Sequence, residues 1–199
     1  MNNPPNPTAA DLAHDALRAM SCKDLMSVFA TLPVPLMQEM DGEFAAELLA
    51  QPDAVSQVVG QLTVNNPLWP GRWLCKAFQP VSADRGQGYN SFSQLGRTVR
   101  RYPMQTLIAP SRYDGRPAYT LVYAAFRSMC GAIHMVDEVR RAGPGVYLGI
   151  GTWGYTARQR MLPLPFVLRG PIAPYAGHIG TARPGFDVRT EVPALNPKG

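Results

Sequence analysis

Residues 104–123 read Met104-Gln-Thr-Leu-Ile-Ala-Pro-Ser-Arg-Tyr-Asp-Gly-Arg-Pro-Ala-Tyr-Thr-Leu-Val-Tyr123. Apolar residues recur on both sides of Asp114 and Gly115, as they do in strands with one buried face. An Asp-Gly pair between two such runs is typical of a β-hairpin, because both central residues of a type I′ turn need a positive φ. A two-residue turn here places Ile108 opposite Leu121. The stretch therefore predicts a long antiparallel hairpin.

More strands are expected on both sides of this hairpin, separated by residues that favour turns. The predicted strands are 72–79, 95–101, 104–110, 116–127, 132–141, 145–155 and 163–169. Residues 51–70 are predicted to be a long loop with at most one helical turn, around Ala54–Val59, and the Gly- and Ser-rich segment 82–92 is predicted to be a loop. Residues 36–50 fit either a helix or a strand. Many short strands of this kind build sandwiches or barrels. We expect a mainly β fold, an antiparallel β-barrel of about seven to nine strands with an N-terminal helical arm.

The chain divides into four expected segments. Residues 1–7 are rich in Pro and Asn and are predicted to be a disordered tail. Residues 8–31 are predicted to form the helical arm, because apolar residues recur there at helical spacing. The barrel domain is expected over residues 36–170. Residues 171–199, which are rich in Pro and Gly, are expected to be irregular.

Composition excludes several classes of function. The 199 residues are enough for one domain with a substantial core. The net charge of +5 comes from arginines scattered along the sequence, so we expect no nucleic-acid partner. No signal peptide is visible, and no apolar run approaches the roughly 18 residues of a membrane helix. A cytoplasmic protein without a membrane span is the expectation.

Cofactor and metal motifs are missing from the sequence. Cys22, Cys75 and Cys130 are too widely spaced for a disulfide framework or a zinc site. There is no Gly-rich phosphate loop, no calcium loop and no nucleophile elbow. We therefore expect neither a cofactor nor a metal.

The predicted strand 132–141 carries the most informative polar residues. Alternation places Asp137 on an apolar face with Val139, where a desolvated carboxyl could act as an acid or base near neutral pH. The alternative is an Asp at a strand end, paired with a nearby arginine. His134 and Glu138 lie on the opposite face, which either lines a pocket or forms a row of exposed salt bridges.

Aromatic residues on the predicted strands are candidates for lining a pocket. In the strand 145–155, Gly149 and Gly151 share a face with aromatic residues and would leave open space beneath them, or else mark a bend of the barrel. Ordinary strand aromatics are the alternative reading. The expected ligand-binding residues are Trp73, Tyr119, Tyr123, Arg127, Tyr147 and Trp153.

Two segments carry a resemblance to a known family. Met40-Asp-Gly-Glu-Phe44 precedes the series of strands, and Val136-Asp-Glu-Val-Arg-Arg-Ala-Gly-Pro-Gly-Val-Tyr-Leu-Gly-Ile-Gly151 lies within it. In these segments the chain resembles lipocalin-like (calycin-type) domains of uncharacterised bacterial type. The resemblance implies a barrel around a hydrophobic cavity that carries a small apolar molecule. Phe44 stands where lipocalins usually show Trp, and the helical arm is foreign to that family, so no functional residue is carried over.

Two functions fit these expectations. The first is binding of a small hydrophobic molecule, similar to a lipid, terpenoid or polyketide, oriented by polar groups such as Tyr123, Arg127 and Asp137. The alternative is a cofactor-independent isomerase, cyclase or dehydratase. In that case Asp137 or Glu138 is the acid or base, and Tyr123 or His134 polarises a carbonyl. A third reading is an interaction module, in which the N-terminal helix contacts a partner or forms a homodimer.

Overall fold

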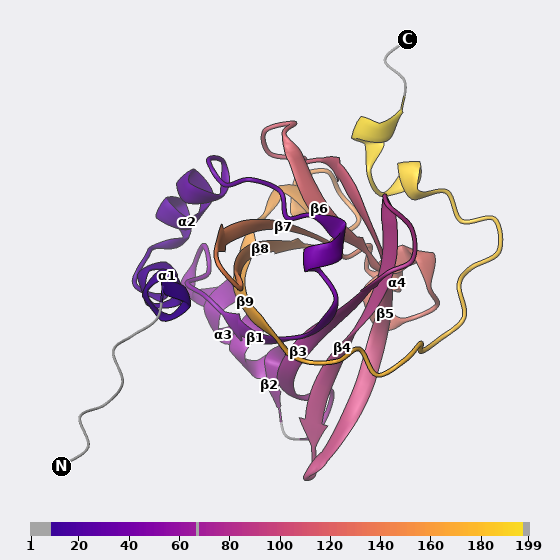
Figure 1. Cartoon of the computed structure of the whole chain (residues 1–199), viewed down its shortest axis with the longest axis horizontal. Coiled ribbons are helices and arrows are strands. Elements are labelled where there is room, and N and C mark those ends of the chain that lie inside the picture. The colour runs from indigo at the N-terminus through magenta and orange to yellow at the C-terminus, as the bar shows by residue number, and fades with distance from the viewer. Residues whose placement is uncertain (1–8, 67, 197–199) are drawn as a thin grey trace.

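The computed structural model describes residues 9–66 and 68–196 and forms a closed antiparallel barrel (Figure 1). The strands are β1 Gly42–Leu48, β2 Asn65–Asn66, β3 Gly71–Pro80, β4 Arg85–Gln94, β5 Arg97–Pro110, β6 Pro117–Val122, β7 Val136–Gly143, β8 Val146–Thr152 and β9 Leu164–Ala173. Their order is β1-β9-β8-β7-β6-β5-β4-β3-β2, and β1 also pairs with β3. This second pairing closes an eight-stranded barrel and leaves β2 as an extra strand. The expected mainly β barrel is confirmed.

Helices occupy the N-terminal arm, three connections between strands and the C-terminal segment. The α-helices are α1 Ala9–Arg18, α2 Cys22–Phe29, α3 Ala54–Val64 and α4 Met129–Ala132, and the short 3₁₀ helices are η1 Met37–Glu39, η2 Tyr123–Ala125, η3 Gln159–Met161, η4 Val188–Thr190 and η5 Pro193–Leu195. The arm breaks at Ser21, whose hydroxyl accepts a hydrogen bond from the Asp24 N–H and so caps α2. The predicted tail, 1–7, lies outside the described residues. Within the described part of the chain, every helix is too short or too polar to cross a membrane.

The structure corrects two predicted loops. Residues 82–92 contribute most of β4, and their small side chains permit close strand packing rather than a loop. A Cβ on Gly88 would lie 2.3 Å from the Ala77 carbonyl oxygen on β3. Residues 51–70 contain the whole of α3, which Asp53 caps by accepting from the Ser56 N–H. The ambiguous segment 36–50 begins with η1 and becomes strand from Gly42.

Several predicted strand boundaries also change. The expected strands 95–101 and 104–110 are one continuous strand, β5, and the expected strand 116–127 ends at Val122. The hairpin loop between β5 and β6 spans residues 111–116, so Ile108 pairs with Tyr119 instead of Leu121. The predicted register was therefore wrong by two residues. Because side chains alternate with a period of two, the same residues still face the interior.

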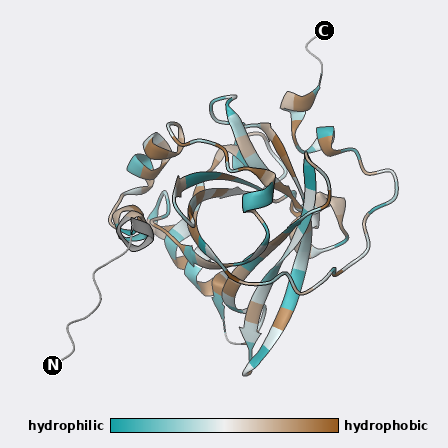
Figure 2. Cartoon of the chain, viewed as in Figure 1, coloured by the Kyte–Doolittle hydropathy of each residue, from teal (hydrophilic) through white to brown (hydrophobic). Residues whose placement is uncertain are grey.

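The strands enclose one apolar core and carry further apolar clusters on their outer surface. Hydrophilic and hydrophobic residues alternate along the long β4–β5 hairpin (Figure 2). The interior cluster includes Phe44, Phe78, Met104, Tyr119, Leu121, Tyr123, Tyr147, Phe166 and Leu168. Outside, Leu25 and Phe29 of the arm pack against Leu148 on β8, while Val192 of the C-terminal segment packs against Leu107 on β5. These apolar residues of α2 are thus buried against the chain's own barrel.

Candidate functional site

A cluster of buried polar side chains lies inside the barrel. Lys76 Nζ is 2.7 Å from Asp137 Oδ2, 2.6 Å from the Tyr123 hydroxyl and 3.1 Å from Asn90 Oδ1. The Tyr123 hydroxyl donates to Asp137 Oδ2 at 2.9 Å and accepts from Asn90 Nδ2 at 3.2 Å. All four side chains are almost completely buried. An ion pair with two hydrogen-bonding partners therefore stands within an otherwise apolar core.

Two opposite walls of the barrel supply this cluster. Lys76 on β3 and Asn90 on β4 are paired residues of neighbouring strands. Asp137 lies on β7, and Tyr123 immediately follows β6, the neighbour of β7. In the closed order, four steps separate β3 from β7, so these walls face each other across the lumen. The cluster is consequently a contact across the centre of the barrel.

Hydrogen bonding within the cluster is complete except at one atom. The Lys76 ammonium has three N–H donors and three polar partners. Asn90 Oδ1 also accepts from Trp73 Nε1 at 3.1 Å, and the proton of the Tyr123 hydroxyl goes to Asp137. Asp137 Oδ1 is buried and has no hydrogen-bond partner among the described residues. The group that the cluster leaves available is therefore a carboxylate acceptor, which suits a ligand hydroxyl or N–H donor.

Aromatic rings surround the charged atoms. Lys76 Nζ lies 5.2 Å from the ring centroid of Trp73, 5.3 Å from that of Tyr123 and 5.1 Å from that of Phe166. Such contacts stabilise an ammonium that has left water. Burial and, secondly, the Asp137 charge raise the pKa of the Tyr123 hydroxyl well above its usual value. Burial raises the pKa of the Cys130 thiol to about 12. Both shifts favour the protonated forms of these groups.

The two glycines of β8 do not leave the open space that their aromatic neighbours suggested. A Cβ on Gly149 would lie 2.1 Å from the Phe166 ring, so that ring fills the position. A Cβ on Gly151 would lie 3.2 Å from Asp137 Oδ1 and 3.5 Å from the Leu164 carbonyl oxygen. Gly151 is also the strand partner of Asp137. The position that a side chain of residue 151 would take therefore lies next to the unpartnered carboxylate oxygen and the Leu164 carbonyl oxygen.

The structure brings together three of the predicted site residues, Trp73, Tyr123 and Asp137. Tyr119 and Tyr147 also belong to the interior core but lie away from the cluster. The Tyr119 hydroxyl donates to Thr106 at 2.9 Å, and the Tyr147 ring packs on Phe44. Arg127 and Trp153 are exposed, because β6 and β8 end before reaching them.

Glu138 and His134 lie outside the lumen, in an arrangement that neither sequence alternative described. Glu138 is buried on the outer face of β7, where its Oε1 accepts from the Arg112 N–H at 2.9 Å. His134 Nδ1 is 2.7 Å from Glu191 Oε1 in the C-terminal segment. Glu138 and Glu191 border a hollow of about 520 Å³ between the barrel and that segment. The β5–β6 loop, which holds Arg112, and the C-terminal segment, which holds Glu191, therefore cover this part of the outer wall only in part.

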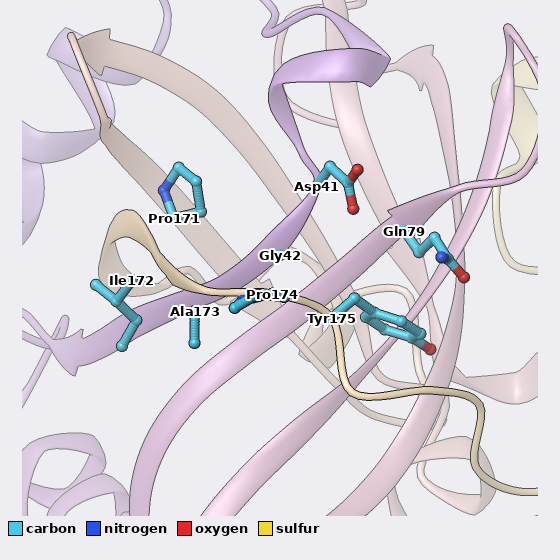
Figure 3. A pocket seen from close by; sticks show the side chains of 8 residues that line it. All are labelled: Asp41, Gly42, Gln79, Pro171, Ile172, Ala173, Pro174 and Tyr175. Atoms are coloured by element: carbon cyan, nitrogen blue, oxygen red, sulfur yellow. The ribbon is translucent and has the colours of Figure 1, made fainter.

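Another open hollow, of about 570 Å³, lies where β1 begins and β9 ends. Gln79 and Tyr175 lie along one flank of this hollow, and Pro171 and Ile172 along the other (Figure 3). β3 ends beside it, whereas Trp73 stands at the start of the same strand. The hollow is therefore at the end of the barrel away from Trp73. The buried cluster is the candidate site, because the ionisable side chains of Lys76, Tyr123 and Asp137 meet there. The ionisable side chains that line this hollow are those of Asp41 and Tyr175.

Sequence reasoning missed Lys76 and Asn90. Strict alternation along β3 put Trp73 on the face opposite Lys76, but a bulge between Trp73 and Cys75 turns both inward. A lysine sharing a face with Phe78 was the available signal for Lys76. Asn90 was hidden in the segment taken for a loop.

Coordination of a metal ion finds no support in the described residues. No group of three or more His, Cys, Asp or Glu side chains in residues 9–66 and 68–196 is placed to hold a metal ion. The polar cluster contains one carboxylate, one ammonium, one phenol and one amide. These groups suit hydrogen bonding and proton transfer.

Comparisons with known proteins give the fold and little else. No known protein family and no curated protein matches this sequence. The crystal structure of a protein from Thermomonospora curvata is similar, with a TM-score of 0.52 and 13% identity, and the match covers 81% of this chain and 98% of that one. At that identity the similarity shows a shared fold only. The barrel implied by the lipocalin-like resemblance is present, whereas membership of that family is not confirmed.

Proposed function

We propose that this chain binds a small, largely apolar molecule inside its barrel and anchors it at Asp137. The observation that carries the proposal is the buried, unpartnered Asp137 Oδ1 within an aromatic lumen. Leaving a buried acceptor unsatisfied costs about 1–3 kcal/mol, and more for a charged group. A ligand that donates a hydrogen bond to this atom removes that cost. The preferred ligand is accordingly an apolar molecule with one hydroxyl or N–H group.

Entry of the ligand would require side chains to move. An eight-stranded barrel is just wide enough for its own side chains or for one small ligand. Trp73 is only partly buried and packs edge-on against Phe166, at 5.8 Å between ring centroids. Displacing these two rings would expose the Lys76–Asp137 pair from one end of the barrel. Affinity would then come mainly from buried apolar area, at about 25 cal/mol per Å².

Native mass spectrometry of the full chain purified from its own host tests this proposal. We expect an adduct with the mass of a small organic molecule. The paired substitution Lys76→Met with Asp137→Leu should remove the adduct, because it removes the anchor. Tyr119→Phe is the matched control: it deletes an interior hydroxyl away from the cluster and should keep the adduct. Absence of any adduct from the natural chain, or its retention in the paired variant, would contradict the proposal.

A proton-transfer enzyme is the second candidate, and the same atom favours it. A carboxylate oxygen without a partner can accept a proton from a bound substrate. The Tyr123 proton is used by Asp137, and His134 lies outside the lumen, so neither side chain is placed to polarise a carbonyl there. An enzyme predicts turnover of the co-purified molecule and a loss of at least about 100-fold in rate with Asp137→Asn. A carrier predicts binding without turnover.

A further inference from the structure

Helix α3 presents an apolar face to solvent. Val55, Val58, Val59 and Leu62 follow the i, i+3, i+4, i+7 spacing of one helix face, and each is more than half exposed. None of the described side chains of α3 is buried. A helix in a globular protein normally turns such a face toward the core. Burial of the apolar face of α3 therefore requires a partner other than the barrel.

Neighbouring segments extend this face into a larger patch. After α3, β2 pairs with the first residues of β3, and the Gln94 side chain donates to the Leu68 carbonyl oxygen. This contact sets the tip of the β4–β5 hairpin beside residues 68 and 69. Leu68, Trp69 and Leu95 are each at least half exposed. We call the whole set the apolar edge; it consists of Val55, Val58, Val59, Leu62, Leu68, Trp69 and Leu95.

Charge around the apolar edge has one predominant sign. The sequence contains no Asp or Glu from residue 54 to residue 83, and none from 85 to 113. Arg72 and Arg97 are exposed beside the edge, on β3 and at the base of the hairpin tip. Asp53, the N-cap of α3, is an acidic residue at the start of this helix. The edge is thus an apolar surface bordered by arginines.

We propose that the apolar edge docks on the surface of an anionic lipid bilayer. A helix with one exposed apolar face can lie in the interface plane, with its apolar side chains below the headgroups. Trp69 belongs to a residue type that favours this interface, and the arginines would meet anionic headgroups. A symmetric contact with a second copy is disfavoured, because it would gather the arginines of both copies at one interface.

The apolar edge lies near the candidate site, but docking through this edge does not require that site. β3 begins two residues after Trp69, a member of the edge, and reaches Trp73 two residues after Gly71. The apolar edge and the end of the barrel that holds Trp73 are therefore neighbours. A docked protein would hold this end close to the lipid phase, where apolar molecules are stored. Docking itself needs no bound ligand and can be tested alone.

Co-sedimentation of the full chain with vesicles tests the inference. We expect binding to vesicles that contain phosphatidylglycerol and weaker binding to pure phosphatidylcholine. Val58→Ser with Leu62→Ser should weaken binding by about ten-fold or more, because both apolar side chains leave the interface. Val81→Ser with Ile172→Ser is the matched control. It removes two equally exposed apolar side chains from the other end of the barrel and should bind like the natural chain.

Charge variants separate the electrostatic part of docking. Arg72→Gln with Arg97→Gln should weaken binding to phosphatidylglycerol vesicles but not to pure phosphatidylcholine vesicles. Arg85→Gln, in the β3–β4 hairpin, should leave binding to both kinds of vesicle unchanged. Light scattering checks the rival occupant. If the natural chain is a dimer and the variant Val58→Ser with Leu62→Ser is a monomer, the proposal is overturned in favour of a second copy. Failure of the natural chain to bind either vesicle, or equal losses in the two serine pairs, would overturn it as well.

Discussion

On each face of the barrel wall one ion pair has an almost completely buried cation, Arg140–Asp114 outside and Lys76–Asp137 inside, and the two pairs differ in the hydrogen bonds that they leave unmade. Outside, the Arg140 guanidinium makes a bidentate contact with Asp114, 2.7 Å at each oxygen. Its donors also reach the carbonyl oxygens of Phe29, Arg116 and Pro117. All five donors of Arg140 are used. Inside, the Lys76–Asp137 pair leaves one carboxylate oxygen without a partner.

This contrast separates a structural role from a functional one. Arg140 bonds to the last residue of α2 and to the β5–β6 loop, so it fastens the helical arm to the barrel. Lys76 and Asp137 contact each other and the side chains of Asn90 and Tyr123 inside the lumen, rather than the backbone of the helical arm or of a hairpin loop. Buried ion pairs often contribute less stability than apolar residues of the same size would. An interior pair that retains an open acceptor is what the proposed binding of a ligand requires.

Loss of the Asp114 charge should have the largest effect on folding. Asp114→Asn leaves the fully buried Arg140 without its counter-charge, and we expect the free energy of unfolding to fall by about 3 kcal/mol. Urea denaturation measures this. Asp187→Asn, which breaks the exposed Asp187–Arg189 pair, is the control and should cost at most about 1 kcal/mol. Equal losses in the two variants would remove the distinction between a fastening pair and a surface pair.

Replacement of the interior pair should show the opposite behaviour. Lys76→Met alone strands a buried carboxylate and should destabilise the fold by about 3 kcal/mol. Adding Asp137→Leu should restore stability, or raise it by about 1–4 kcal/mol above that of the natural chain. The same denaturation experiment applies. A paired variant that stays as unstable as the single one would show that the interior pair is structural after all.

A methyl group at residue 151 should affect the ligand more than the fold. Gly151→Ala places a Cβ 3.2 Å from Asp137 Oδ1, where a bound donor group would otherwise sit. We expect a stability change of about 1 kcal/mol or less, together with loss of the adduct in native mass spectrometry. Ala132→Gly, which removes one methyl group from α4, is the control and should keep the adduct. Retention of the adduct in Gly151→Ala would separate Asp137 Oδ1 from ligand binding.

The smallest expected effect is a loss of stability at acid pH that comes from the Arg140–Asp114 pair. Hydrogen bonds from Arg140 hold the pKa of the Asp114 carboxyl below its ordinary value. The stabilisation is therefore complete above the unfolded carboxyl pKa of about 3.9 and is lost as the pH falls through the lower folded-state pKa. The stability difference between the natural chain and Asp114→Asn should shrink below about pH 4. A difference that stays constant down to pH 2 would contradict this assignment.

Sequence patterns predicted the barrel and some of the residues that meet in its interior cluster, and the failures have physical reasons. Alternation identified Asp137 as an acid on the apolar face of its strand, and that face lines the lumen. A bulge on β3 hid Lys76, because a single extra residue reverses the face of those before it. Asn90 was missed because small residues favour loops in isolation but permit close packing between strands. The sequence pattern also could not show which segments cover the outer charges, since Glu138 and Arg140 owe their burial to distant parts of the chain.

A crystal structure of the chain purified from its own host would test the central claim most directly. The account predicts non-protein density larger than a water molecule, within hydrogen-bonding distance of Asp137 Oδ1, with the rings of Trp73 and Phe166 displaced from their present contact. A lumen filled by the chain's own side chains, with at most a water molecule on that oxygen, would contradict it.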